Sequence, residues 1–578
     1  MSSSIDDRPQ SESAWPDEAR SALRWICTNN PFYAISAALF LVGLWLSFGD
    51  PESAEDTTAL MTGLAGYTLL LAGTACLLVR FAKVWDDART VILLVVLMFL
   101  ATSVTFDHTI VFDIGRNEHP IRGYLCNTIG LVLAISLSAL VLRVVKLRLP
   151  TVYRWPYYLL LMFFFLYPLA LAPFLHAPRG DGMMWGLFGF SSIAGLIFLS
   201  LLPAIRRGAE TVRDNGSPWP WPFYPWSLFG LLALAVPGRA ILLCYSMHLI
   251  DVHDLYDMTF GPYFLIPFGF ALTILLLEAG IVTRHAWVQA GALFAPIGMV
   301  VLSVIGHRGE PIYVEFLQRF ITQLGGTPFF LTLLASAIFY LYAIIRRVSF
   351  ALEGFTAALA ALAFVAPGTM GLGDLVTPRA DPLLVAATLL FAVGIYRRGL
   401  WRCLFASLAL AAGIVLAIPL DSELAPYRCI LAFHVVVGAM MLMGAFFDDD
   451  FAYALRFIAT SLIAFAAVGV MVAPMPLPGN LHPLVALLYP LGLAVLLAAY
   501  GGFLWHPPTL VLAGIVVTIW ISVIGWQIYR IGRQAVVGLD YLAISLLVFG
   551  LAIATSLAKS GHLSRGVSWL RERFVRAE

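Results

Sequence analysis

Long apolar runs separated by short polar segments recur from residue 31 almost to the end of the chain. Crossing the hydrocarbon core of a bilayer takes about 20 apolar residues in a helix, and roughly eighteen runs reach this length. Each run must be helical, because lipid offers no hydrogen-bond partner to bare backbone. The pattern therefore predicts an all-α fold, a polytopic integral membrane helix bundle with about 18 transmembrane helices. The runs begin near Pro31, Ala59, Thr90, Ile121, Trp155, Asp181, Tyr224, Phe260, Ala286, Thr327, Ser349, Asp381, Gly399, Tyr427, Phe451, Pro483, Pro508 and Leu539.

Polar segments divide these runs into five parts. Residues 1–30 form a predicted cytoplasmic N-terminal tail, 31–305 a first membrane bundle of about nine spans, and 306–326 an extracytoplasmic interfacial helix. Residues 327–558 form a second bundle of about nine spans, followed by a basic cytoplasmic tail at 559–578. The interfacial helix is predicted from apolar residues that recur at helical spacing between polar ones. These residues are Ile312, Phe316, Phe320 and Leu324.

Basic residues distinguish the two sides of the membrane. With the N-terminus inside, most of the 35 Lys and Arg residues fall in inside loops, and more than half of the 34 Asp and Glu residues fall outside. Because Lys and Arg are retained on the cytoplasmic side, this alternation predicts an N-in, C-in topology. The chain starts with a polar, acidic stretch rather than the basic start of a cleaved signal peptide, so the first run is predicted to remain as a span. We expect an integral protein of the bacterial inner (plasma) membrane.

Composition supports this class and limits the partners. Hydrophobic residues make up 60% of the chain and charged residues 12%, against about a quarter charged in soluble proteins, which excludes a water-soluble fold. A net charge of +1 without a Lys/Arg-rich tract argues against a nucleic-acid partner. No GxxxxGK[ST] motif is present, so no nucleotide is expected in a P-loop. Membrane lipid is the one partner that the pattern requires.

Arg239 stands inside an apolar run, directly after Pro237-Gly238. An arginine in the middle of a bilayer costs roughly 2.5–3.5 kcal/mol, so it must face protein or water and have a partner. Glu278, inside the next run, is the obvious partner by sequence, but its depth differs by roughly 10 Å and we do not expect a direct pair. Two interpretations remain. Arg239 binds carbonyls freed by the proline or a neighbouring helix, or it binds an anionic substrate or a coupling carboxylate.

The segment HLIDVHDLYD, which begins at His248, concentrates imidazoles and carboxylates at the outer end of this run. These groups together suit zinc, manganese or iron-type ions. We therefore expect a divalent cation on the extracytoplasmic face, and its candidate ligands are His248, Asp251, His253 and Asp254. The spacing matches no defined ligand signature, so a solvated acidic loop is the alternative.

A second segment, TFDHTIVFDIGRNEHP, is predicted to lie in another outside loop and repeats this chemistry. It contains Asp107, His108, Asp113, Glu118 and His119. If the two outer loops meet, they form one site. The candidate substrate-binding residues are Arg239, Asp107, His108 and Asp251.

Three consecutive aspartates, Asp448 to Asp450, occupy a short turn before a later run. Aspartates at a helix start bind exposed N–H groups and oppose the positive end of the helix dipole, so a helix cap is predicted. The alternative is a magnesium-diphosphate site, but the second acidic cluster that such a site requires is absent from the sequence.

Three functions fit a chain of many spans without a soluble domain. The leading one is translocation of a small or lipid-linked substrate, of which an anionic one would suit Arg239. Against it, the pattern places no acidic residue at mid-membrane depth. The second is a membrane-embedded transferase for a lipid-linked sugar or phosphate, with Asp50, Asp107 or Asp251 as base or metal ligand. The third is a non-catalytic scaffold or accessory subunit. A cavity lined jointly by Arg239, Asp107 and Asp251 would favour the first two functions, and a closed bundle would favour the scaffold.

Overall fold

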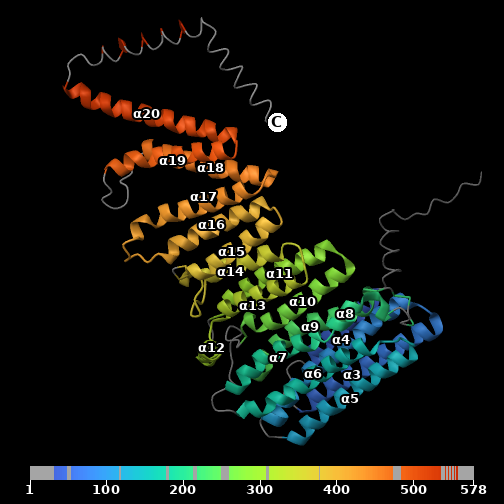
Figure 1. Cartoon of the computed structure of the whole chain (residues 1–578). Helices are drawn as coiled ribbons and strands as arrows, with labels where there is room; N and C mark the ends of the chain where they lie inside the picture. Colours follow the sequence, from blue (N-terminus) through green and yellow to red (C-terminus); the bar gives the residue numbers. More distant parts are fainter. Residues whose placement is uncertain are drawn as a thin grey trace, which may run out of the picture. The chain divides into compact units, whose positions relative to one another are not determined.

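The computed structural model describes residues 31–48, 54–115, 119–176, 181–212, 216, 218–219, 221–248, 260–307, 311–376, 378–472 and 483–535, with single positions beyond 540. Throughout this part of the chain every regular element is a helix, as Figure 1 shows. The predicted all-α fold is therefore confirmed for the described residues.

The chain forms two compact units. Unit 1 comprises Met1–Ala358 with Val365–Val376, and unit 2 comprises Leu359–Phe364 with Thr377–Glu578. The helices of unit 1 are α2 (Phe32–Phe48), α3 (Ala54–Leu77), α4 (Trp85–Thr109), α5 (Pro120–Val144), α6 (Thr151–Leu171), α7 (Asp181–Leu199), α8 (Leu202–Arg207), α9 (Phe223–His248), α10 (Ile266–Thr283), α11 (Ala286–Val304), α12 (Pro311–Leu324) and α13 (Pro328–Ile345). Helix α14 (Ala351–Ala363) crosses the boundary between the units. Those of unit 2 are α15 (Ala380–Tyr396), α16 (Leu400–Ala417), α17 (Arg428–Phe446), α18 (Asp450–Val472), α19 (Pro483–Phe503) and α20 (Pro507–Ala535).

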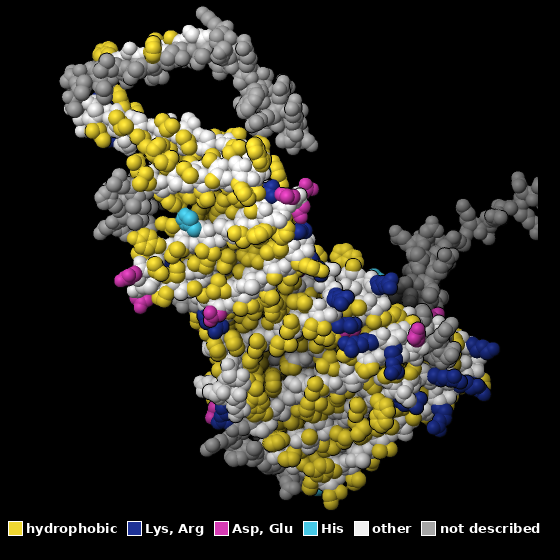
Figure 2. All heavy atoms as spheres, viewed as in Figure 1, with side chains coloured by type: hydrophobic (Ala, Val, Ile, Leu, Met, Phe, Trp, Pro, Cys, Tyr) yellow, Lys and Arg dark blue, Asp and Glu magenta, His cyan; other side chains and the backbone are white. Residues whose placement is uncertain are grey.

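Most of these helices have the length and composition of membrane spans. Within the described residues, thirteen are long and apolar enough to cross a bilayer, and the shorter apolar helices are Phe32–Leu44, Ala351–Ala363, Ala380–Tyr396 and Leu487–Phe503. Together they coincide with all the predicted runs up to the one near Pro508. The last run, near Leu539, lies mostly outside the described residues. Large apolar side chains cover the visible flank of the helices in unit 1, as Figure 2 shows.

Short basic turns join several neighbouring helices. Arg284, Arg347 and Arg398 have φ angles of 56°, 58° and 54°, in the left-handed region that ends a helix. The connections that contain Arg284 and Arg398 have two and three residues, and the one that contains Arg347 has five. Tight hairpins therefore form as predicted between α10 and α11 and between α15 and α16.

Helix α12 matches the predicted amphipathic segment between 306 and 326. Its buried side chains are Tyr313, Phe316, Leu317 and Phe320, whereas Ile312 and Leu324 are exposed. The buried face of α12 is therefore rotated slightly about the helix axis, relative to the face predicted from the apolar spacing. Phe316 and Phe320 pack on Trp185 of α7, with ring centroids 5.2 and 6.0 Å away. Helix α12 therefore belongs to the core of unit 1, and the compact units divide further along the chain than at this helix.

In unit 2 the three aspartates stand at the start of α18, as the cap interpretation requires. The Ala452 N–H donates to Asp449 Oδ1 over 2.9 Å. Asp448 accepts a hydrogen bond from Arg456 over 2.7 Å, and Asp449 lies 3.2 Å from Arg398. Arginines on both sides thus bind two of the three carboxylates, which is the arrangement of a helix cap and not of a magnesium site.

Candidate functional site

Two charged residues meet in the interior of unit 1. Arg239 of α9 binds the carboxylate of Asp107 on α4 with both terminal nitrogens, and the Nη2–Oδ1 distance is 2.7 Å. Nη2 also donates to the Ser103 carbonyl over 3.1 Å. The side chain of Asp107 is 0% exposed and that of Arg239 3%. The two charges therefore form a dry, two-pronged ion pair, the strongest geometry that arginine and a carboxylate adopt.

Arg239 lies within the candidate span Phe223–Met247, and Asp107 is the last residue of the candidate span Trp85–Asp107. Asp107 lies a little over two turns, or about 12 Å, before the end of the π-helical segment Ile110–Gly115 that continues α4. Arg239 lies at a similar distance before the end of α9. Pro237, inside α9, cannot donate a backbone hydrogen bond and so weakens the helix next to the arginine. The pair joins α4 to α9 beside a weak point of α9.

Asp107 and His108 do not lie in an outer loop, so their predicted position is wrong. Both lie in α4, and helical structure continues beyond them to Gly115. The flanking side chains of Phe106, Ile110 and Val111 are buried, which favours a continued helix, and Arg239 neutralises the carboxylate. An acidic residue therefore lies within a helix, at the end of a candidate span, and not in the loop that the sequence predicts.

Most of the predicted metal site falls outside the described residues, namely Asp251, His253, Asp254 and Asp257. His248 is the last residue of α9. Among the residues that are described, no group of three or more His, Cys, Asp or Glu side chains could hold a metal ion. The divalent cation at 248–257 stays a prediction.

The other candidate residues of the second acidic segment lie in different elements or outside the described residues. Asp113 lies in the π-helical segment, 3.8 Å from Arg122 of α5, and His119 immediately precedes α5. Glu118 lies outside the described residues. Of the four predicted substrate-binding residues, Arg239 and Asp107 are thus brought together, His108 is the neighbour of Asp107 along α4, and the fourth, Asp251, is not described.

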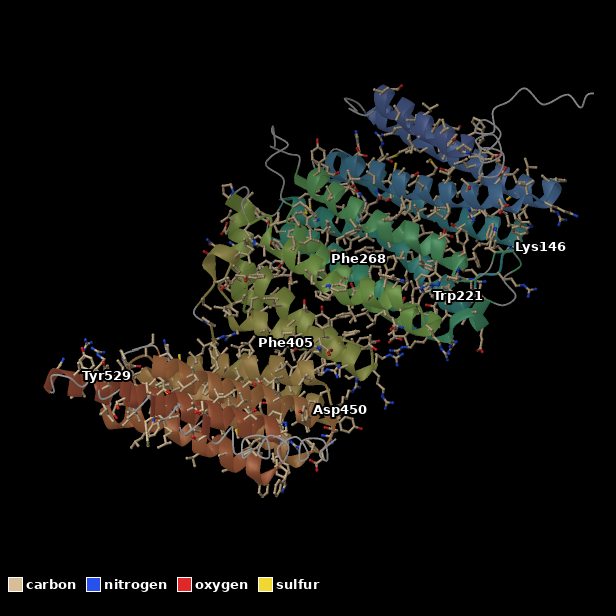
Figure 3. All side chains as sticks on the ribbon, turned by 90° about the horizontal axis from the view of Figure 1, so that it is seen from above. Lys146, Trp221, Phe268, Phe405, Asp450 and Tyr529 are labelled. Carbon is tan, nitrogen blue, oxygen red and sulfur yellow. The ribbon has the colours of Figure 1, made fainter. Side chains whose placement is uncertain are left out.

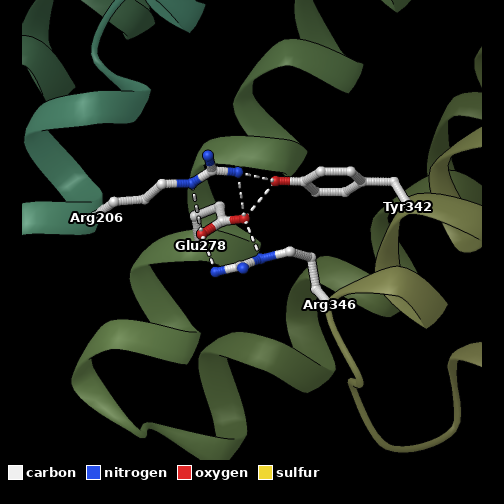
Figure 4. A network of polar contacts seen from close by, with 4 residues as sticks. All are labelled: Arg206, Glu278, Tyr342 and Arg346. Carbon is white, nitrogen blue, oxygen red and sulfur yellow. Dashed lines mark hydrogen bonds and ion pairs between the residues drawn. The ribbon is translucent and has the colours of Figure 1, made fainter.

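A second buried carboxylate binds two arginines, as Figure 4 shows. Glu278 of α10 accepts hydrogen bonds from Arg206 of α8 over 3.2 Å and from Arg346, at the end of α13, over 2.9 Å. The hydroxyl of Tyr342 donates to the same carboxylate and accepts from Arg206 over 3.0 Å. Glu278 is fully buried, whereas the side chains of Arg206 and Arg346 are 44% and 34% exposed. This Glu278 cluster carries one negative and two positive charges.

The Glu278 cluster is absent from the sequence predictions, which consider Glu278 only as a partner for Arg239. A signal was nevertheless present in the predicted topology. Arg206 and Arg346 fall in inside loops and Glu278 near the inner end of its span, so all three share one depth. Two residues can pair only if they lie at the same depth. Glu278 meets this condition with Arg206 and Arg346 but not with Arg239.

Within the described part of the chain, thirteen long apolar helices and charges buried as ion pairs are consistent with a multi-pass membrane protein. No protein-family model, curated protein or solved structure matches this chain. The function proposed next therefore rests on the residues themselves.

Proposed function

We propose that this protein is a membrane transporter for a small or lipid-linked anionic substrate, in which Asp107 and Arg239 form an exchangeable ion pair. The observation that carries the proposal is the dry, two-pronged pair between α4 and α9 of unit 1. Ionisable residues in membrane spans are costly and mark substrate or ion pathways more often than other intramembrane residues do. Proline within α9, two positions before the arginine, supplies a place at which that helix can bend.

Exchange works because the interior can stay neutral at each stage. An anionic group displaces the Asp107 carboxylate from the guanidinium, and Asp107 takes up a proton or a cation in return. The Nε of Arg239 is buried and has no hydrogen-bond partner among the described residues, so one donor of the fork is left for an incoming oxygen. Arginine keeps its charge throughout, because it does not deprotonate in proteins.

We further propose an N-in, C-in topology of about eighteen crossings in the bacterial inner membrane. The gathering of Lys and Arg side chains along one end of unit 1 in Figure 2 supports it, since basic residues stay on the cytoplasmic side. In this orientation the Asp107–Arg239 pair lies in the outer half of the membrane. A reporter active only in the cytoplasm should work when fused after Arg89 or Arg148 and fail after Glu118. Two reversed results would overturn the topology.

A scaffold or accessory subunit is the second candidate, because both charges of the pair are satisfied by each other in a closed interior. In a scaffold the pair only joins α4 to α9. The transferase has less support. Its candidate base Asp107 is fully buried and bound to arginine, and its other two candidates, Asp50 and Asp251, lie outside the described residues.

Melting curves of the purified full chain separate transporter from scaffold. The panel contains inorganic phosphate, small carboxylates and lipid phosphates, tested on the parent, Asp107→Asn and Arg239→Lys. If the protein is a transporter, at least one anion raises its free energy of unfolding by RT ln(1 + [L]/Kd). The melting temperature of Asp107→Asn should rise more than that of the parent, because the competing carboxylate is gone. Arg239→Lys responds less, because it lacks the planar fork.

Glu315→Gln is the matched control, since it also removes one carboxylate but from the exposed partner of Arg319 on α12. It should respond like the parent. If no anion shifts the melting temperature of the parent or of Asp107→Asn, the transporter is overturned and the scaffold remains.

A further inference from the structure

An open cavity of about 710 Å³ lies between α2, α3 and α5 of unit 1. It is separate from both ion pairs, since its lining includes no residue of α4, α9 or α10. Figure 3 shows α2 and α3 along one edge of unit 1. The volume falls in the usual range for small-molecule sites, roughly 300–1,000 Å³. The lining residues are Phe40, Thr58, Ala59, Thr62, Gly63, Gly66, Tyr67, Leu70 and Arg122.

One end of this α2–α3–α5 groove is polar and cationic. Arg122, in the first turn of α5, donates from Nη2 to the Thr58 hydroxyl in the first turns of α3, over 2.9 Å. Thr62 lies one turn further along the same face of α3. Asp113 lies 3.8 Å from the Arg122 guanidinium. The side chain of Arg122 is still 31% exposed, so it can bind a further anionic oxygen.

The rest of the groove is apolar and follows α3 away from this end. The lining positions from Thr58 to Leu70 share one helix face, and the part from Gly63 to Leu70 spans roughly 10 Å at 1.5 Å per residue. That length fits within half of the hydrocarbon core, which is about 30 Å thick. Phe40 and Tyr67 stack at 4.1 Å and form one wall, while Leu70 is 61% exposed at the open side. A Cβ added at Gly66 would meet no atom within 4 Å, so this glycine keeps the floor open.

We propose that this groove binds one anionic phospholipid of the leaflet in which Arg122 lies. The phosphate of the headgroup binds Arg122, and one acyl chain lies along Gly63, Gly66 and Leu70. A phospholipid is the occupant because the groove has a cationic end, an apolar part that fits within one leaflet, and an opening beside helices that are candidate membrane spans. The proposal goes beyond the transporter, because it requires nothing of Asp107 or Arg239.

Lipid-dependent melting of the full chain in a neutral detergent tests the groove. The probes are phosphatidylglycerol, phosphatidylcholine and inorganic phosphate, and native mass spectrometry counts the lipids retained. For the parent, phosphatidylglycerol raises the melting temperature more than phosphatidylcholine does, and inorganic phosphate has no effect. Equal stabilisation by both lipids, or an effect of phosphate alone, would overturn the proposal.

Gly66→Leu places a side chain on the floor of the groove, where an added Cβ would meet no atom within 4 Å. It should lose one retained lipid and the phosphatidylglycerol shift. Gly73→Leu is its control, since Gly73 lies on the same helix, is also exposed, and also has open space around an added Cβ, but does not line the groove. It should behave like the parent.

Arg122→Gln removes the charge and keeps a polar side chain. It should weaken the binding of phosphatidylglycerol by about tenfold, the equivalent of one charge-assisted hydrogen bond, and weaken that of phosphatidylcholine less, because choline already balances the charge of its phosphate. If Gly66→Leu and Arg122→Gln both retain the parent's response, the groove is not a lipid site. Because Asp107→Asn leaves the groove intact, failure of the transporter and failure of the lipid site give different results.

Discussion

Two buried carboxylates of unit 1 bind arginines in sites that differ in exposure and in charge. The Asp107–Arg239 pair is one to one and fully buried between α4 and α9. The Glu278 cluster has two arginines on one buried carboxylate, and both arginines reach the surface at the helix ends. The chemical groups are the same, so the difference comes from the surroundings.

The contrast follows from the energy of burying charge. Away from water a net charge costs several kcal/mol, so only a neutral pair is tolerated deep in the bundle. At the helix ends water and lipid headgroups screen the excess positive charge of the Glu278 cluster. We therefore expect the deep pair to be the more sensitive to loss of one partner. The predictions that follow test this ranking.

The largest effect is expected for Asp107→Leu. It leaves Arg239 charged, buried and without its carboxylate, which should lower the free energy of unfolding by about 3–5 kcal/mol. Unfolding of the purified protein in mixed detergent measures it. The double variant Asp107→Leu/Arg239→Met should recover most of the loss, because it removes both charges and keeps the volume. A double variant as unstable as Asp107→Leu would show that the pair is not an isolated unit.

Glu278→Gln should cost less, about 1–3 kcal/mol. Arg206 and Arg346 lose their shared carboxylate, but both can turn toward water because each is already partly exposed. Their mutual repulsion is screened by salt, so raising the ionic strength should restore part of the loss. The same salt series should leave Asp107→Leu unchanged. A cost for Glu278→Gln equal to that of Asp107→Leu, without salt dependence, would contradict the ranking by depth.

Tyr342→Phe should have a smaller effect, about 1–1.5 kcal/mol, because it removes one hydrogen bond to a charged acceptor. Tyr340→Phe is the matched control on the same helix. Its hydroxyl donates to the neutral Leu293 carbonyl over 2.7 Å, and such bonds are about half as strong. Thermal melting of the two variants side by side should therefore rank Tyr342→Phe as the less stable. The reverse order would show that the hydrogen bond of Tyr342 contributes little to the stability of the Glu278 cluster.

The helices could be predicted from the sequence because an apolar run is a local property of the chain. The reversals at Arg284 and Arg398 could be predicted for the same reason, since two polar residues between long runs leave room only for a hairpin. The amphipathic segment Pro311–Leu324 was readable from its spacing, although its buried face includes Tyr313 and Leu317 as well as the predicted phenylalanines.

The ion pairs could not be predicted, because they depend on which helices pack together. Asp107 and Arg239 are 132 positions apart, and apolar periodicity carries no information about that contact. A charged residue usually ends a membrane run, which is why the pattern places Asp107 in a loop. Its partner on α9 allows it to stay in the helix. The sequence does show that Arg239 needs a partner, and it gives the shared depth of Glu278, Arg206 and Arg346.

The smallest predicted effect is a pH dependence of stability that arises outside the Asp107–Arg239 pair and the Glu278 cluster. Neither of them contains a histidine, whereas His307, just after α11, packs against Tyr263 with ring centroids 6.2 Å apart. Burial lowers the pKa of His307 below its usual value of about 6.5. The unfolded chain therefore binds the proton more readily, so the contribution of His307 to stability is present above pH 6.5 and is lost as the pH falls below it, toward the lowered folded pKa.

Melting temperatures at pH 7.5 and 5.5 measure this contribution. The parent should be less stable at the lower pH, and His307→Gln should reduce the difference between the two melting temperatures. His285→Gln, which removes an exposed imidazole from the α10–α11 turn, is the control and should leave the difference as it is in the parent. The effect should be the smallest of the four because it arises from a single, partly buried ring outside the spans. If His307→Gln keeps the full pH dependence of the parent, the acid sensitivity arises elsewhere in the chain, and the Asp107–Arg239 pair and the Glu278 cluster then have to be titrated separately.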